Sequence, residues 1–232
     1  MATMSTAVWI AAASLPVIAF VVIIVVAVRS MQREMGAIRT IGRTPASPIG
    51  QVQEGALAKI VGLARPAGEP LTAPLTGRPC VHFEASIQHH VGGHGMDRGG
   101  PWETEGQESR SQPFLVEDDG GGRALVETDG AWILLQAMDL QQELQKGEPR
   151  SDEMRDMRGR HDHEDAETAT LRERYLEGII GEQQRVAVYG RCAWETDPDP
   201  GGGAGYRGAP RRLRVSAPPG AKVLITTDPG LF

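Results

Sequence analysis

The sequence predicts one N-terminal transmembrane helix followed by a mainly β domain, a small antiparallel barrel or sandwich with one short amphipathic helix. Three observations lead to this fold class. Residues 7–28 form an apolar run without a charged residue, which is long enough to cross a bilayer. Beyond residue 51, short segments alternate apolar and polar side chains, as half-buried strands do. The 29 glycines and 16 prolines supply the turns that a chain of short strands requires.

The apolar run from Ala7 to Val28 is expected to be an uncleaved anchor. At about 1.5 Å per residue a helix of this length measures about 33 Å, slightly more than the roughly 30 Å hydrocarbon core of a bilayer. The preceding residues, MATMST, carry no basic side chain, and the run is longer than the apolar core of a signal peptide. Pro16 removes one backbone hydrogen bond, which membrane helices tolerate.

Basic residues follow the anchor and indicate its orientation. Arg29, Arg33, Arg39 and Arg43 come directly after it, whereas the residues before it contain no Lys or Arg. Since positive charges stay on the cytoplasmic side, we expect a single-pass protein with its N-terminus outside and its C-terminal domain in the cytoplasm.

The chain is expected to divide into three parts. Residues 1–28 are the transmembrane anchor, residues 29–50 are a basic, proline-containing juxtamembrane linker, and residues 51–232 are the β domain. The β domain contains a charged insertion at about residues 141–170, where the strand pattern is lost.

The charge distribution argues against nucleic-acid binding. Residues 1–28 contain no Asp, Glu, Lys or Arg, and residues 29–50 contain four Arg and one Glu, a local charge of +3. Removing this from the net charge of −6 leaves −9 on the remaining chain. A domain with this charge repels a phosphate backbone, so we expect no nucleic-acid partner.

The two cysteines, Cys80 and Cys192, are too few for a disulfide framework and too far apart for a zinc finger. We expect two half-buried thiols in a reducing compartment. A single disulfide is the alternative, and it would require the domain to lie outside the cytoplasm.

The first half of the domain is expected to contain strands at residues 51–65 and 80–91. In the second of these, Val81, Phe83, Ala85 and Ile87 share one face, as the two-residue period of a strand requires. Other segments follow in order: a long polar loop at 92–111, a hairpin at 112–129 that turns at DGGG, and an apolar strand at 130–140.

The second half begins with the expected amphipathic helix at residues 166–180, where Leu171, Tyr175, Leu176 and Ile179 fall on one helical face. Apolar and polar side chains then alternate again, with Val186, Val188, Cys192 and Trp194 as the apolar positions. The remaining segments are strands at 182–195, 211–218 and 221–228, with a glycine-rich loop at 196–210.

Two groups of histidines are the candidate metal ligands. His89, His90 and His94 surround a glycine-rich segment, and His161 and His163 lie in the charged run. Imidazoles next to carboxylates are suited to divalent metals, but neither group has the spacing of a helical H-E-x-x-H site. We interpret both groups as exposed polar residues and predict no metal ligands.

No other motif predicts catalysis. The glycine runs Gly120 to Gly122 and Gly201 to Gly203 lack the flanking residues of a phosphate-binding loop and are interpreted as turns, and no serine lies in a G-x-S-x-G elbow. Trp102, Trp132 and Trp194 are interpreted as core or rim anchors rather than as a binding platform. We therefore predict no catalytic and no cofactor-binding residues.

Four segments, taken in order, resemble one known domain. They are Gly55 to Gly62, PLTAPLTGRPCVHFEASI, PFLVEDDGGGRALVETDGA and GEQQRVAVYGRC. Together they resemble the BAM (beside-a-membrane) or GIDE domain of the mitochondrial RING-type E3 ubiquitin ligase family. The segment Pro70 to Val81 is the most specific of the four, and the resemblance runs from about residue 50 to the C-terminal end.

The resemblance implies a protein-interaction module next to a membrane. In that family the domain lies between two membrane helices and precedes a cytosolic RING domain. Here no second apolar helix follows AKVLITTDPG, and two cysteines cannot supply the zinc ligands of a RING. The sequence therefore gives no residue-level support for ligase activity in this chain.

We expect a single-pass, membrane-anchored protein-interaction module that acts beside the bilayer, in membrane stress or substrate recruitment. Its expected partners are the lipid bilayer, through residues 7–28, and a protein. It is expected to be no enzyme and to hold no cofactor. Two alternatives remain open: an E3 ubiquitin ligase-like enzyme by family resemblance, and a metal-binding sensor that uses the histidine clusters.

Overall fold

The computed structural model describes residues 36–90, 100–144, 150–161, 172–198 and 211–232. The chain divides into two compact units, Met1–Arg43 and Thr44–Phe232. In the first unit the described residues, 36–43, are helical. The predicted anchor lies outside the described residues, and among those described no helix is both long and apolar enough to cross a membrane.

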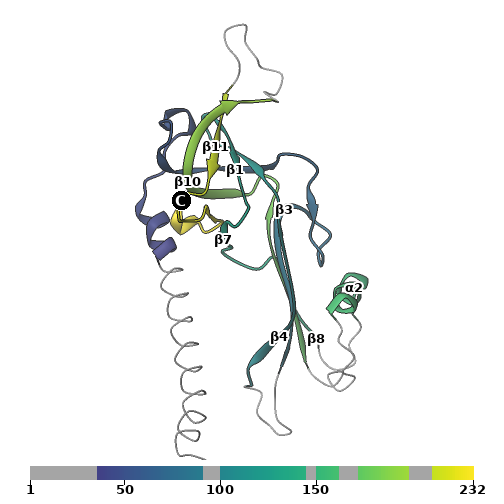
Figure 1. Cartoon of the computed structure of the whole chain (residues 1–232). Coiled ribbons are helices and arrows are strands. Elements are labelled where there is room, and N and C mark those ends of the chain that lie inside the picture. Colours follow the sequence, from purple (N-terminus) through teal and green to yellow (C-terminus); the bar gives the residue numbers. More distant parts are fainter. Residues whose placement is uncertain (1–35, 91–99, 145–149, 162–171, 199–210) are drawn as a thin grey trace, which may run out of the picture. The chain divides into compact units, whose positions relative to one another are not determined.

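The second unit is mainly β (Figure 1). Its described elements, in chain order, are η1 (Ile49–Gln51), β1 (Leu57–Pro66), β2 (Leu71–Thr72), β3 (Pro79–His90), β4 (Trp102–Ser111), β5 (Phe114–Glu117), β6 (Arg123–Val126), β7 (Trp132–Leu134), β8 (Leu140–Leu144), α2 (Asp152–His161), β9 (Glu173–Gly181), β10 (Arg185–Thr196), β11 (Arg211–Ser216), β12 (Leu224–Thr226) and η3 (Pro229–Leu231).

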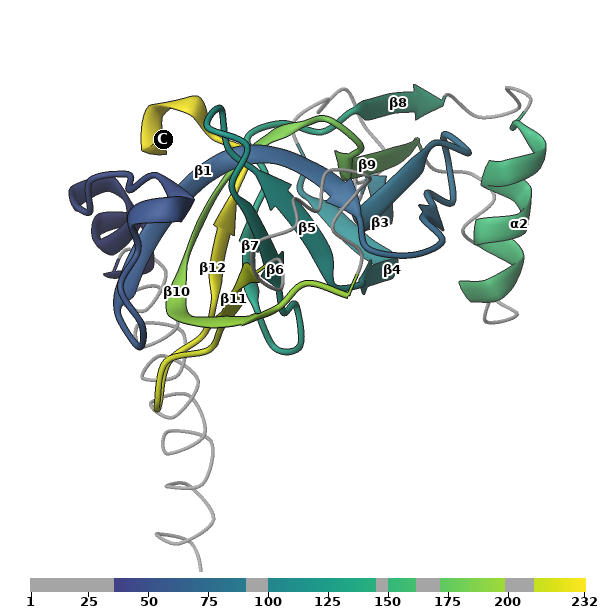
Figure 2. The same ribbon diagram turned by 90° about the horizontal axis from the view of Figure 1, so that it is seen from above.

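Five strands close into a barrel, which is one of the two closures, barrel or sandwich, predicted from the sequence. β1 pairs with β5, β5 with β6, β6 with β11, β11 with β10, and β10 pairs again with β1. These pairings are antiparallel except that of β6 with β11. β12 adds to β10, and β7 adds to β12. Figure 2 shows the barrel strands beneath β1.

The bend of β10 makes this closure possible. Its residues Arg185–Arg191 pair with β1, and Arg191–Thr196 pair with β11. Gly190 lies where the two pairings meet, and a Cβ there would lie 2.7 Å from Val215 Cγ1 and 2.8 Å from the carbonyl oxygen of Ser216. The approach is too close for any side chain, so this position requires glycine.

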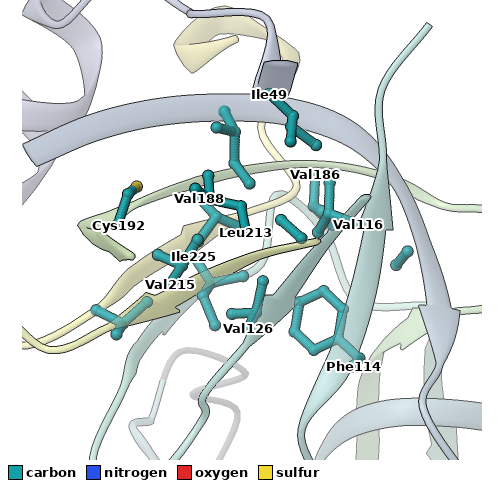
Figure 3. Packing of buried hydrophobic residues seen from close by; sticks show 14 of the residues in the cluster. Ile49, Phe114, Val116, Val126, Val186, Val188, Cys192, Leu213, Val215 and Ile225 are labelled. Carbon is teal, nitrogen blue, oxygen red and sulfur yellow. The ribbon is translucent and has the colours of Figure 1, made fainter. Parts of the chain in front are cut away.

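Apolar side chains fill the barrel (Figure 3). Phe114 of β5, Val188 of β10 and Leu213 of β11 are fully buried there. Ile49 of η1 is fully buried in the same cluster, so residues that the sequence placed in the linker at 29–50 contribute to the core. Each such side chain contributes roughly 1.5–3 kcal/mol when it is removed from water.

A second sheet has the order β4-β3-β9-β8, all antiparallel, and β2 pairs with the first residues of β3. Val81 of β3 and Ile180 of β9 belong to the barrel core. These two strands therefore connect the second sheet to the barrel and continue beyond it (Figure 1).

Helix α2 covers one face of the second sheet (Figure 2). Met154 and Met157 of α2 pack in a buried cluster with Tyr175 of β9. Gly106 of β4 lies directly against the end of the helix, where a Cβ would lie 2.7 Å from His161 Cγ. The absence of a side chain at Gly106 lets the helix approach the sheet.

The amphipathic helix predicted at residues 166–180 is wrong over its described part, because residues Glu173–Gly181 form strand β9. Residues 166–171 lie outside the described part of the chain. Tyr175 and Ile179 are four residues apart, a spacing that places two side chains on one face of a helix or of a strand. The segment pairs with β3 on one side and with β8 on the other, and this pairing stabilises the strand over a helix. The helix lies instead at α2, inside the predicted charged insertion.

The long polar loop predicted at residues 92–111 is also wrong in its second half. Residues Trp102–Ser111 form β4, which pairs with β3 along its length. β4 lacks an apolar face because its contacts with α2 are ionic: Arg158 lies 3.4 Å from Glu105, and Arg160 donates to Glu108 at 2.7 Å. Residues 91–99 of that loop lie outside the described part of the chain.

The predicted hairpin at residues 112–129 is confirmed. β5 and β6 pair antiparallel, with Phe114 opposite Val126. The side chain of Asp118 closes the turn, since it accepts hydrogen bonds from the backbone N–H of Gly120 at 3.1 Å and of Gly122 at 2.7 Å. The strands predicted at residues 51–65, 80–91, 130–140, 182–195, 211–218 and 221–228 correspond to β1, β3, β7, β10, β11 and β12. β1 begins only at Leu57, and β7 covers only Trp132–Leu134.

Candidate interaction site

A group of aromatic and charged side chains lies on the face of the second sheet opposite α2. Side chains alternate across a strand, so Arg172 and Arg174 point away from the face on which Tyr175 meets α2. The register places Gln88 beside Arg174 and His90 beside Trp102. We call the following residues the Trp102 cluster: Gln88, His90, Trp102, Glu143, Arg172 and Arg174.

The guanidinium groups of the cluster lie against the indole ring. Arg174 Cζ is 4.5 Å and Arg172 Cζ is 5.7 Å from the centroid of the Trp102 ring, within the range of cation–π attraction. The His90 ring meets Trp102 edge-on, with 5.3 Å between centroids and 79° between planes. Trp102 itself is half-buried.

Hydrogen bonds fix both arginines. Arg174 Nε donates to Gln88 Oε1 at 3.0 Å, and Arg174 Nη2 donates to the same oxygen. Arg172 Nη2 donates to Glu143 Oε2 at 2.7 Å. The cluster is thus held by contacts among β3, β4, β8 and β9, and its side chains are ordered before any partner arrives.

A second arrangement on the same face contains the residue types of nucleophilic catalysis. His82 Nδ1 lies 2.8 Å from Ser111 Oγ, and His82 Nε2 lies 3.4 Å from Glu84 Oε1. A serine, a histidine and a carboxylate in contact form the constellation of a hydrolase triad.

Local geometry makes the group of His82, Ser111 and Glu84 an unsuitable catalytic site. His82 and Ser111 are directly opposite each other across the β3–β4 pair, and Glu84 is two residues along β3 from His82. Such neighbours meet on any sheet face. His82 is only 2% exposed. The N–H of Gln112, the residue after the serine, donates to the carbonyl of Val81 at 3.0 Å and is not available to stabilise an oxyanion.

The buried carboxylate of Glu173 fastens α2 to the second sheet. Arg150 donates to it through Nε at 2.8 Å and Nη2 at 2.6 Å, Arg158 Nη1 donates at 2.6 Å, and the Tyr175 hydroxyl donates at 3.0 Å. Burial alone would raise the pKa of Glu173, but the Arg150 hydrogen bond and the charges of both arginines outweigh it and lower the pKa. Glu173 is therefore ionised and fully paired.

Glu177, also buried, has an equally structural role. It accepts hydrogen bonds from the backbone N–H of Leu75 at 2.6 Å and of Thr76 at 3.2 Å, and from the Thr76 hydroxyl at 2.5 Å. These bonds hold the connection between β2 and β3 against β9. With its acceptor oxygens occupied, Glu177 is unsuited to acid–base catalysis.

The described histidines of the two predicted groups, His89, His90 and His161, are separated from one another. His89 and His90 point to opposite faces of β3, with His89 Nε2 3.7 Å from Glu103 and His90 in the Trp102 cluster. His161 lies 3.0 Å from Glu108 on the α2 side. His94 and His163 are outside the described residues. Within the described ranges, no group of three or more His, Cys, Asp or Glu is placed to hold a metal.

Both cysteines are free and fully buried rather than half-buried. Cys80 packs with Phe83 and Ile179, whereas Cys192 lies in the barrel core. Burial raises the pKa of each thiol to about 11, so neither is a reactive nucleophile at neutral pH. The disulfide alternative is absent from the structure.

The sequence analysis interpreted Trp102 as a core or rim anchor rather than as part of a binding platform, and it did not identify Arg172 and Arg174. Trp194 fits the predicted role of rim anchor, because its Nε1 donates to the carbonyl of Val52 at 3.0 Å. In the predicted helix, Arg172 and Arg174 would have pointed in different directions. The signal that identifies them is their two-residue spacing around Glu173, which places both on one face of a strand.

Comparison of the chain with protein-family models, with curated proteins and with solved structures gives no match. The function is therefore inferred from the residues described above.

Proposed function

We propose that this protein is a single-pass membrane protein whose β domain binds a protein partner beside the bilayer, through the Trp102 cluster. The apolar run at residues 7–28 and the arginines that follow it support an anchor with the domain on the cytoplasmic side. The resemblance of four segments to the BAM domain supports a role next to the membrane, in membrane stress or substrate recruitment.

The Trp102 cluster is the observation on which the binding function depends. Tryptophan and arginine are the residues that most often dominate the binding energy of protein interfaces. Here a half-buried Trp102 lies against two guanidinium groups on a hydrogen-bonded sheet. Since Arg174 and Arg172 are already held by Gln88 and Glu143, a partner would lose little side-chain entropy on binding them.

The two alternative functions gain no support from the described residues. A ubiquitin ligase requires a RING or a reactive cysteine, whereas Cys80 and Cys192 are buried with raised pKa values. A metal-binding sensor requires convergent ligands, and the described histidines are separated. We therefore propose binding, without catalysis, as the activity of this chain.

Proximity labelling from the C-terminus of the full chain in living cells tests this function. The wild-type protein should label a specific set of neighbours, and Trp102→Ala should lose them. Arg191→Gln, which removes an exposed arginine of the barrel, is the matched control and should retain them. Neighbours that are identical for the wild type and Trp102→Ala would overturn the proposed role of the cluster.

Membrane anchoring is tested separately. The full chain should stay in the membrane pellet after alkaline carbonate extraction, and deletion of residues 7–28 should release it. For orientation, Gln53→Cys places a thiol at an exposed position, while the two native thiols stay buried. A membrane-impermeant maleimide should label this variant only after the cells are opened; labelling of intact cells would contradict the cytoplasmic placement.

A further inference from the structure

We infer that the partner presents a carboxylate to Arg174, so that the ligand of the Trp102 cluster is an acidic peptide segment. This inference rests on the proposed binding function and names the chemistry that Arg174 would recognise. It follows from the charge of the cluster, from the hydrogen-bonding edge that Arg174 leaves open, and from a buried nitrogen atom without a partner.

Arg174 is the one described arginine of the second unit that is both half-buried and without a carboxylate partner. Among the described arginines of the second unit, four have no carboxylate partner: Arg110, Arg174, Arg191 and Arg211. Of these, only Arg174 is half-buried, whereas the others are exposed to solvent. A half-buried cation loses part of its hydration, and a counter-ion would offset the free-energy cost of that loss. The neighbouring Arg172 is already neutralised by Glu143, so the cluster carries one uncompensated positive charge.

The open edge of Arg174 has the shape of a carboxylate site. A guanidinium has two edges that can bind two oxygen atoms, one through Nε and Nη2 and one through Nη1 and Nη2. Gln88 Oε1 accepts from Nε and Nη2. The Nη1 edge makes no hydrogen bond with any described residue. Since the guanidinium is 4.5 Å from the indole centroid, its position is set while this edge stays available.

His90 supplies the independent observation. Its side chain is 8% exposed, and its Nε2 has no hydrogen-bond partner among the described residues. The Nε atom of Arg172 is likewise buried without a partner, although the Arg172 side chain as a whole is 35% exposed. Buried polar atoms are nearly always paired, so two such atoms in one cluster indicate a site that a polar ligand completes.

A carboxylate fits better than a phosphate-rich ligand. The chain beyond residue 50 carries a net charge of −9, which repels a polyanion such as a nucleic acid or an anionic lipid surface. A single carboxylate needs one cation, and the cluster offers one. The Trp102 ring beside it provides apolar contact area for the peptide.

The test uses the full chain in detergent micelles and a fluorescein-labelled Gly/Leu peptide that contains one Glu, with the matched peptide that has Gln at that position as control. Fluorescence anisotropy measures both affinities. We expect the glutamate peptide to bind about tenfold more tightly than the glutamine peptide. Arg174→Gln should abolish this preference, and Arg191→Gln should keep it. Circular dichroism of both variants controls for folding.

Three outcomes would overturn the inference: equal binding of the two peptides, equal loss in both arginine variants, or displacement of the glutamate peptide by inorganic phosphate at constant ionic strength. These outcomes are separable from a failure of the proposed function. If Trp102→Ala changes the labelled neighbours in cells while the glutamate peptide shows no preference, the cluster binds a partner of another chemistry. If the peptide preference depends on Arg174 while the neighbours do not depend on Trp102, the proposed binding function fails.

Discussion

The barrel and the second sheet are built from different interactions, although β3 and β9 of the second sheet contribute Val81 and Ile180 to the barrel core. The barrel interior contains apolar side chains such as Phe114 and Val188. The second sheet buries the carboxylates of Glu173 and Glu177 and holds α2 through arginines. Hydrophobic burial is insensitive to pH and little affected by salt, whereas ion pairs respond to both. The region that carries the Trp102 cluster is therefore the more adjustable half of the domain.

The largest expected effect tests the apolar half of this comparison. Phe114→Ala removes a fully buried ring from the barrel core and should lower the free energy of unfolding by about 3–5 kcal/mol. Urea denaturation of the full chain in detergent measures it. Leu57→Ala, at a side chain that is 53% exposed, is the control and should change it by less than about 0.5 kcal/mol. Similar losses in both variants would contradict a barrel-based core.

The next effect tests the ionic half. Glu173→Gln leaves Arg150 and Arg158 facing a neutral group, and we expect a loss of about 2–3 kcal/mol, less than for a fully buried pair because both arginines are partly exposed. Hydrogen exchange should show lost protection in α2 and unchanged protection in the barrel strands. Equal loss in the barrel strands would show that the two regions unfold as one.

Acid should reproduce this effect reversibly. The pKa of Glu173 is lowered in the folded protein relative to its ordinary value of 4.5, so its ionised form stabilises the fold. That contribution is complete above about pH 4.5 and is lost as the pH falls through the lowered folded pKa. Exchange protection of α2 should therefore decrease over this acidic range before that of the barrel. In the Glu173→Gln variant, lowering the pH over the same range should cause no such early loss of exchange protection in α2.

The smallest effect uses the two native thiols as reporters, one in each region. Cys80 lies at the start of β3, next to the two-residue strand β2, and Cys192 lies in the barrel core. Both thiols have a pKa of about 11, so access rather than acidity should set their rates. We expect Cys80 to react with a maleimide faster than Cys192, as read by peptide mass spectrometry. Equal rates would indicate that only global unfolding exposes them.

The elements predicted correctly from the sequence are those whose own residues carry the pattern. In β3, Val81, Phe83, Ala85 and Ile87 alternate with polar residues, and the β5–β6 hairpin has a glycine turn between apolar segments. Such patterns depend on neighbours in the chain, and they identify a strand without knowledge of its partners.

The elements that were predicted wrongly depend on distant partners. β4 is polar after Trp102, because charged residues of α2 contact it, and a strand of this kind has no apolar period. β9 has residues that fit either period, and only its pairing with β3 and β8 decides. The helix in turn uses just Met154 and Met157 as its apolar contacts within a charged run.

The candidate site depends on register to an even greater degree. The sequence shows that a tryptophan is present at position 102, but its contact with Arg174 forms only because β3 lies between β4 and β9. The irregularity between Ile87 and Gln88 shifts that register, and sequence alternation does not reveal such a bulge. The group of residues therefore emerges from the sheet and not from any local motif.

Barrel closure also sets a sequence of events during synthesis of the chain. β1 pairs with β10, which is synthesised much later; Leu57, for example, lies opposite Arg191. β6 likewise pairs with the later strand β11, where Leu213 lies opposite Ala124. At the usual pace of translation, roughly ten seconds separate the emergence of β1 from that of β10. During that interval β1 has an unpaired edge, and pairings between distant segments form slowly. If synthesis stops before residue 211, the resulting chain lacks the barrel strand β11. Such a truncated chain keeps unpaired strand edges and is expected to be bound by chaperones and degraded by proteases.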